Sequence, residues 1–317
     1  MSLGNVFGLL KNELLKTYIR KSTWVMYGVI LALIIGSAVL TAVFDDVITT
    51  DYSDNWREEL TQENEQYIKD AEEFGFEDMY ASDIAKNNYY LENDIQPTGY
   101  KAWQFTLDNA MLASLISLFT IIIGAGIVSS EFKWGTIKLL LIRPISRTTI
   151  LFTKFLTVLL FAFATLVFTI LLSLIVGSIF FGFEGINPYF VLETVNGFEY
   201  VSLIAEVFQT YGYSMVTLVM MTAFAFMIST IFRNSSLAIG LAIFLMFSGN
   251  MIVAAFSDYK FAKYILFANT NLKQYETGHL LFDDMTLGFS VVVLIVYFVL
   301  FLAVSWLSFN KRDVAGH

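Results

Sequence analysis

The sequence predicts an all-α integral membrane protein with six transmembrane helices. Of its 317 residues, 56% are hydrophobic and 15% are charged, whereas soluble proteins keep about a quarter of their residues charged. Six long runs contain no Asp, Glu, Lys or Arg, and about 20 helical residues cross the hydrocarbon core of a bilayer. Lipid offers no hydrogen bonds to bare backbone, so each run is expected to be helical. The predicted spans are Trp24 to Phe44, Asn109 to Ser130, Phe155 to Phe183, Val207 to Phe232, Asn234 to Ser257 and Met285 to Asn310.

The distribution of basic residues predicts the orientation, because short loops rich in Lys and Arg stay in the cytoplasm. One side of the predicted bundle carries 12 basic residues, whereas the loop 184–206 opposite has none and the loop 258–284 has three. We therefore expect a multi-pass protein of the bacterial plasma membrane with both termini, including the tail 311–317, in the cytoplasm. The absence of cysteine excludes disulfides and thiolate metal sites.

The segment 45–108 is long and strongly acidic, with 17 Asp and Glu residues against four Lys and Arg. Trp56, Leu60, Tyr67 and Ala71 recur at roughly helical spacing, which predicts an acidic helical extracytoplasmic domain between the first and second spans. The simpler interpretation is a solvated cap over these spans. The alternative is an acidic surface that attracts cationic peptides.

The N-terminal segment 1–23 is expected to form an amphipathic helix. Val6, Leu9, Leu10 and Leu14 share one helical face and are accompanied by four basic residues. This pattern is typical of a helix that lies in the inner interface, beside anionic lipid head groups. A basic flank that only sets the topology is an alternative compatible with the first.

Several classes of function are disfavoured by what the chain lacks. The predicted spans carry no charge, and its three prolines, Pro97, Pro144 and Pro188, lie in loops, unlike the charged relays and broken helices of ion-coupled transporters. The sequence has two histidines, His279 and His317, and contains neither H-E-x-x-H nor G-x-x-x-x-G-K. We therefore expect a non-enzymatic chain that binds no cofactor, metal or nucleic acid, whose apolar spans suit a lipophilic or amphipathic cargo.

The loop 131–154 concentrates charge, a glycine and a proline between two apolar spans. Good helix formers from Glu131 to Ile142 predict a short helix, and Pro144 should end it by disfavouring a helical Arg143. Ser146 or Thr148 can then cap the third span. A basic loop that merely sets the topology is the alternative interpretation.

These residues carry a resemblance to a known family. Glu131, the run Gly135-Thr136-Ile137-Lys138-Leu139-Leu140, the run Arg143-Pro144-Ile145-Ser146-Arg147, and Lys154 resemble the signature of type-2 ABC-transporter permeases, and the six-span layout is similar as well. The resemblance implies a pair of permeases, identical or paralogous, bound to two cytosolic ABC ATPase subunits that carry ATP and Mg²⁺. It also implies that the loop acts as a coupling helix and that 258–284 is re-entrant. The residues expected to contact the ATPase are Glu131, Lys133, Gly135, Thr136, Lys138, Arg143, Pro144 and Arg147.

We therefore expect the permease subunit of an ABC exporter, coupled to its ATPase through residues 131–147 and surrounded by membrane lipid. The long acidic segment after the first span is similar to outer domains in branches that export antimicrobial peptides or confer resistance to them. Two alternatives stay open: a non-transporting immunity or sensor protein that binds a cationic peptide, and a sodium exporter of the same ABC family.

Overall fold

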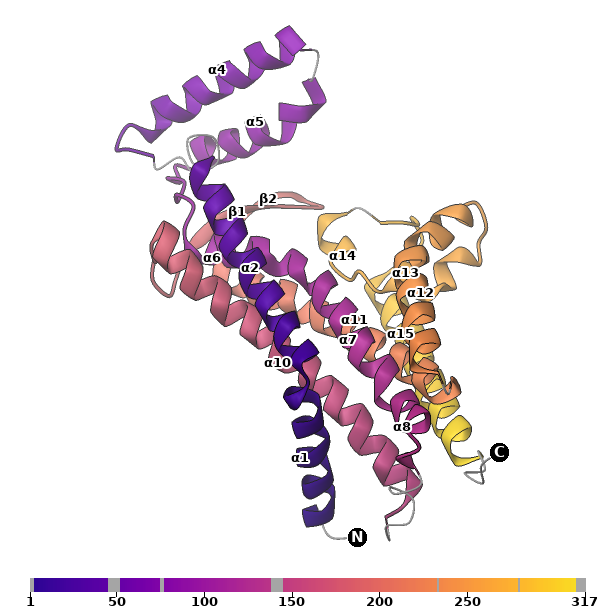
Figure 1. Ribbon diagram of the computed structural model, residues 1–317. Coiled ribbons are helices and arrows are strands. Elements are labelled where there is room, and N and C mark those ends of the chain that lie inside the picture. The colour runs from indigo at the N-terminus through magenta and orange to yellow at the C-terminus, as the bar shows by residue number, and fades with distance from the viewer. Residues whose placement is uncertain are drawn as a thin grey trace.

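The computed structural model describes residues 3–44, 52–74, 77–137, 145–232, 234–278 and 280–311. In this part of the chain six helical segments are long and apolar enough to cross a membrane, which confirms the six-span, mainly helical architecture (Figure 1). The spans are α2 (Lys21–Val43), the combined segment α6 (Ala102–Asp108), η1 (Asn109–Leu112), α7 (Ala113–Ile127) and α8 (Ser129–Lys133), then α10 (Arg147–Phe181), α11 (Leu203–Ile231), α12 (Ser235–Ala255) and α15 (Leu287–Asn310).

Four spans begin earlier than the uncharged runs in the sequence: the first at Lys21 rather than Trp24, the second at Ala102 rather than Asn109, and also α10 and α11. The helix α10 begins at Arg147 rather than Phe155, and α11 begins at Leu203 rather than Val207. The reason is the same in both, since a charged residue near the end of each helix, Lys154 or Glu206, is buried and ion-paired. A charge therefore does not mark the boundary of these helices.

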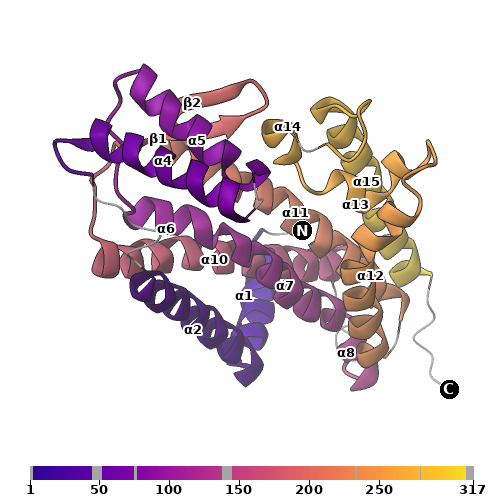
Figure 2. The same ribbon diagram turned by 90° about the horizontal axis from the view of Figure 1, so that it is seen from above.

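The second and fourth spans are the most buried and form the centre of the bundle. Viewed from above, α7 and α11 lie between α2 and α10 on one side and α12 and α15 on the other (Figure 2). Gly124 in α7 permits close approach of these helices, because a Cβ there would lie 3.3 Å from both Ala225 and Val158. The peripheral spans α2, α12 and α15 leave many apolar side chains exposed, as expected of helices that face lipid or another apolar chain.

The helix of the second span is interrupted between α7 and α8. Val128 lies at this junction with φ −101° and ψ −46°, and the N–H groups of Val128 and Ser129 both donate to Ser229 Oγ of α11 at 3.1 Å. A hydroxyl from a neighbouring helix thus satisfies backbone groups that would otherwise be buried without a partner. This contact sets the position of α8, which carries Glu131.

At the end of the bundle opposite the described termini, α4 (Trp56–Phe74) and α5 (Glu77–Glu92) pack over a β-hairpin (Figure 1). Strands β1 (Tyr189–Thr194) and β2 (Gly197–Ser202) pair antiparallel, and Gly197 supplies the φ of +107° after the turn. Trp56, Leu60, Tyr90 and Val191 form the shared core. The hairpin was not predicted within the loop 184–206.

The tip of this hairpin reaches the segment between α12 and α15. The N–H of Val195 donates to the carbonyl of Glu276 at 3.1 Å. That segment contains η2 (Ala262–Tyr264), α13 (Leu266–Asn269) and α14 (Gln274–Thr277). It folds back on α11 and α12, because Thr217 Oγ1 donates to the carbonyl of Thr270 at 2.8 Å and Phe267 packs against Gly249, where a Cβ would lie 2.3 Å from the ring.

Candidate functional site: a buried network of ion pairs

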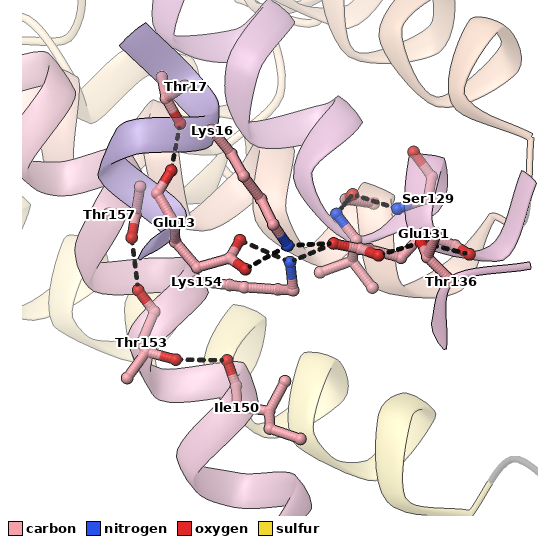
Figure 3. A network of polar contacts seen from close by, with 12 residues as sticks. Glu13, Lys16, Thr17, Ser129, Glu131, Thr136, Ile150, Thr153, Lys154 and Thr157 are labelled. Carbon is pink, nitrogen blue, oxygen red and sulfur yellow. Dashed lines mark hydrogen bonds and ion pairs between the residues drawn. The ribbon is translucent and has the colours of Figure 1, made fainter. Parts of the chain in front are cut away.

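Four charged side chains from three segments meet in one network (Figure 3). The network lies at the end of the bundle where Figure 1 places α1, α8 and the described termini. Glu13 and Lys16 come from α1 (Leu3–Ile19), Glu131 from α8 and Lys154 from α10. Lys154 Nζ lies 2.7 Å from Glu13 Oε2 and 3.0 Å from Glu131 Oε1, while Lys16 Nζ lies 2.9 Å from Glu13 Oε1 and 3.2 Å from Glu131 Oε1. Two lysines face two glutamates, so the network is electrically balanced.

Lys154 is the most deeply buried member, with 1% of its side chain exposed. It lies inside α10, whose N-terminus is capped by Ser146, because Ser146 Oγ accepts from the N–H of Thr149 at 3.2 Å. The flanking hydroxyls of Thr153 and Thr157 donate to backbone carbonyls of α10. A buried ammonium is tolerated only when it is paired and hydrogen-bonded, and the two glutamates meet this requirement.

Glu131 joins the network to the start of the loop that follows. Glu131 is buried, with 7% of the residue exposed. Its Oε1 accepts hydrogen bonds from Lys16 and Lys154, and its Oε2 accepts one from the hydroxyl of Thr136. Between them the chain turns at Gly135, whose φ of +70° favours glycine. The turn therefore folds Thr136 back onto Glu131, so any movement of the loop at this point acts on the ion pairs.

The helix α1 enters the network through the face that packs on α10. Leu9, Glu13 and Thr17 are the buried residues of this face, and Thr17 Oγ1 donates to the carbonyl of Glu13 at 3.0 Å. Burial opposes the charge of Lys16, but its hydrogen bonds and its attraction to Glu13 and Glu131 outweigh this effect and raise the pKa of Lys16.

The described part of the loop differs from the expected continuous helix between Glu131 and Ile142. The helix α8 ends at Lys133, residues 134–136 form a turn, and helical geometry resumes at Ile137. The positive φ of Gly135 breaks the helix, because an α-helix requires negative φ throughout. The expected cap at Ser146 is confirmed.

The residues expected to contact a partner therefore fall into different settings. Glu131 and Thr136 are bonded to each other, whereas Lys133 is exposed at the end of α8. Contact of these residues with an ATPase stays a prediction. Arg147 Nη1 donates to the carbonyl of Asn310 at 3.0 Å and ties the start of α10 to the end of α15. Lys138, Arg143 and Pro144 lie outside the described residues.

Sequence reasoning missed the partnership of Glu13, Lys16 and Lys154. One signal was available, because Glu13 is the only acidic residue among the first 44. A lone acid within an otherwise basic segment indicates a specific cationic partner. A second was the position of Lys154 after Ser146, since a helix capped there continues through it.

The chemistry of this network favours a mechanical role. Its members are two carboxylates and two ammonium groups that satisfy one another, and among the described residues no group of three or more His, Cys, Asp or Glu side chains could hold a metal ion. Three chain segments are bound together, and separating any one leaves a buried charge without its partner. Such an arrangement favours movement as a unit or a switch between two discrete states.

The apolar spans and the buried charge network at one end define a multi-pass membrane protein. Comparison with known proteins gives the family: the chain belongs to the family described as "Protein of unknown function (DUF2705)", whose model matches residues 76–315.

Two proteins of Bacillus subtilis (strain 168) are similar to this chain. "Uncharacterized protein YhcI" is 40% identical over 317 residues, which cover 98% of this chain and 100% of the relative. "Uncharacterized membrane protein YdbK" is 34% identical over 203 residues, covering 63% of this chain and 78% of the relative. The matched part of the family model includes Glu131 and Lys154, whereas α1 with Glu13 and Lys16 lies before it.

Proposed function

We propose that this protein is the membrane subunit of an ATP-driven ABC exporter, coupled through residues 131–147 to a separate cytosolic ATPase that binds ATP and Mg²⁺. The observation that carries the proposal is the contact of Glu131 with Lys154, 3.0 Å apart. It joins the two spans on either side of the loop at the point where each leaves the bundle. A partner that pushes this loop would therefore move both spans together.

In this proposal both termini and the charge network lie at the cytoplasmic face of the bacterial plasma membrane, and α1 lies along the inner interface. A displacement of the loop would enter the bundle at two places. One is the turn at Gly135, where a displacement would move Thr136 and, through its hydrogen bond, Glu131. The other is the capped start of α10, where Arg147 holds the last turn of α15. The second, third and sixth spans would respond as one body.

The proposal gives Glu131 a positioning role and assigns partner contact to the exposed surface beside it. Trp134 is 63% exposed, and the guanidinium of Arg20 lies 5.8 Å from the centre of its ring. Lys133 is exposed next to it. An aromatic ring with adjacent cations is typical of residues that anchor protein interfaces. The exposed apolar sides of α2, α12 and α15 would face lipid and a second permease copy, identical or paralogous.

Purification of the full chain in mild detergent from its own membrane tests this assignment. We expect ATP hydrolysis to co-purify with the wild-type chain and to be lost from the double variant Lys133→Glu with Trp134→Ala. The matched control is Lys11→Glu, which reverses a charge on the exposed side of α1, at the same end of the bundle but outside the loop. Hydrolysis absent from the wild type, or retained equally by all three chains, would contradict the proposal.

A sensor or immunity protein that binds a cationic peptide is the second candidate. The observation favouring it is a cavity of about 290 Å³ between the helices α4 and α5 and the bundle, whose charged lining residues are three acids and one base: Glu63, Asp83, Glu184 and Lys86. Such a protein would bind peptide at this cavity without an ATPase. Peptide binding by a purified chain that never retains ATP hydrolysis would favour this candidate.

A further inference from the structure

We propose that α11, α14 and α15 form an amphipathic site for a cationic amphiphile, with its apolar tail between the helices and its ammonium head beside Glu276. The site lies at the hairpin end of the bundle, away from the charge network of the candidate functional site. The inference rests on the proposed export function in one respect, because it names the class of cargo that the exporter would take.

The place for the tail is an apolar groove between α11 and α15. It encloses about 320 Å³, within the lower range of small-molecule sites. All of its lining residues are apolar, including Met215, Val219, Met220, Leu272, Leu294 and Phe298. Two methionines contribute unbranched, adaptable side chains that fit varied apolar shapes. A groove of this composition takes a hydrocarbon chain and rejects a polar group.

The place for the head is a polar cluster at the adjoining end of α11. Lys273 Nζ lies 3.0 Å from Glu206 Oε1 and 2.9 Å from Thr210 Oγ1, and Glu206 has only 4% of its side chain exposed. Glu276 lies nearby, because the side chains of Gln209 and Tyr213 both donate to its Oε1. The cluster adjoins the apolar groove along the chain, because Lys273 directly follows Leu272, which lines the groove.

The charges of this cluster do not balance. Lys273 bonds to Glu206, whereas Glu276 Oε2 is a buried atom with no hydrogen-bond partner in the described chain. The cluster thus holds two carboxylates and one ammonium, and the negative charge of Glu276 has no ion-pair partner of its own in the cluster. Burial and the proximity of Glu206 raise the pKa of Glu276, as expected for a carboxylate that lacks a cation of its own. A bound ammonium head would supply this missing charge.

One segment holds the two halves of the site together. The carbonyl of Thr270 accepts from Thr217 of α11 at 2.8 Å, and the hydroxyl of Tyr275 lies 2.6 Å from Ser290 Oγ of α15. Between these two anchors, Leu272 lines the groove and Lys273 belongs to the polar cluster. The polar and apolar halves are therefore adjacent and fixed to the same two spans, as one amphiphile requires.

Photo-crosslinking of the full chain in phosphatidylcholine nanodiscs tests the site without any ATPase. Three single-chain probes would share one diazirine-bearing tail and differ in their head: trimethylammonium, sulfate or phosphocholine. We expect the ammonium probe to label peptides containing Met215, Val219 or Leu272 about tenfold more than the sulfate probe, as one favourable charge contact allows. Glu276→Gln should abolish this preference, and Val219→Trp should block labelling by filling the groove.

Two matched variants serve as controls. Glu92→Gln removes the same charge from the exposed end of α5, and Val299→Trp adds the same ring to an exposed position of α15; both should label as the wild type does. Equal labelling by all heads, strongest labelling by phosphocholine, or an unchanged preference in Glu276→Gln would overturn the proposal. None of these results bears on ATPase binding, so failure of this site and failure of the export function are separable.

Discussion

Lys154 Nζ lies 2.7 Å from Glu13 Oε2, which joins the third span to the N-terminal helix across 141 positions of the chain. The same ammonium contacts Glu131 of the second span. A single buried lysine therefore sets the relative positions of three segments. This makes the network sensitive to small changes, because each member compensates charges on more than one partner.

Lys154→Met should be strongly destabilising. It leaves two glutamates buried with only the half-exposed Lys16 to balance them, and loss of one partner from a buried ion pair costs about 3–5 kcal/mol. Thermal unfolding in detergent measures the effect, with Lys11→Met on the exposed side of α1 as control. The double variant Lys154→Met with Glu131→Gln should recover part of the loss. Strictly additive effects of the two substitutions would argue against a coupled network.

Gly135→Ala should strain the turn that returns Thr136 to Glu131. A residue with a Cβ at φ +70° costs roughly 1–2 kcal/mol, so we expect lower thermal stability and weaker retention of co-purifying ATP hydrolysis. Gly8→Ala in α1 is the control, since a Cβ there meets nothing within 4 Å and alanine favours helix. A Gly135→Ala chain as stable and active as the Gly8→Ala chain would exclude a structural role for the turn.

Ser229→Ala should loosen the junction of α7 and α8. It removes the acceptor of two buried N–H groups, and a buried donor without a partner costs about 1–3 kcal/mol. Hydrogen exchange of the Val128 and Ser129 amides should accelerate. Ser178→Ala is the matched control, because that hydroxyl donates to a carbonyl of its own helix. Unchanged exchange at both amides would show that the junction does not depend on Ser229.

The ion pairs of Lys16 should make the stability of the folded protein depend on pH in the alkaline range. Its pKa in the folded protein is raised above the ordinary value of 10.5, so its stabilising contribution is complete below 10.5 and is lost as the pH rises through the raised value. Lys16→Gln should therefore be less stable than Lys11→Gln at neutral pH, and the difference should shrink in strongly alkaline solution. A difference that persisted unchanged there would mean that Lys16 acts through packing rather than charge.

The six spans could be predicted because lipid imposes a simple rule on composition, and the uncharged runs follow it. The same rule misplaced the starts of α10 and α11, since Lys154 and Glu206 are buried with opposite charges rather than solvated. Ser146 was recognisable as a cap from local sequence. The network itself could not be predicted, because it depends on how α1 packs against α10, which is a tertiary relationship between distant segments. The hairpin was missed because its strands are short and are stabilised by the shared core with Trp56, Leu60 and Tyr90.

The β-hairpin has a consequence for how the two ends of the exposed domain communicate. Its first strand is held by α5, where the N–H of Val191 donates to the hydroxyl of Tyr90, and its tip is held by the carbonyl of Glu276. The hairpin therefore connects the acidic helices α4 and α5 to the segment that carries Lys273. A tilt of α4 and α5 would bend the hairpin or break one of its attachments. A force applied to these helices would therefore be transmitted to α14.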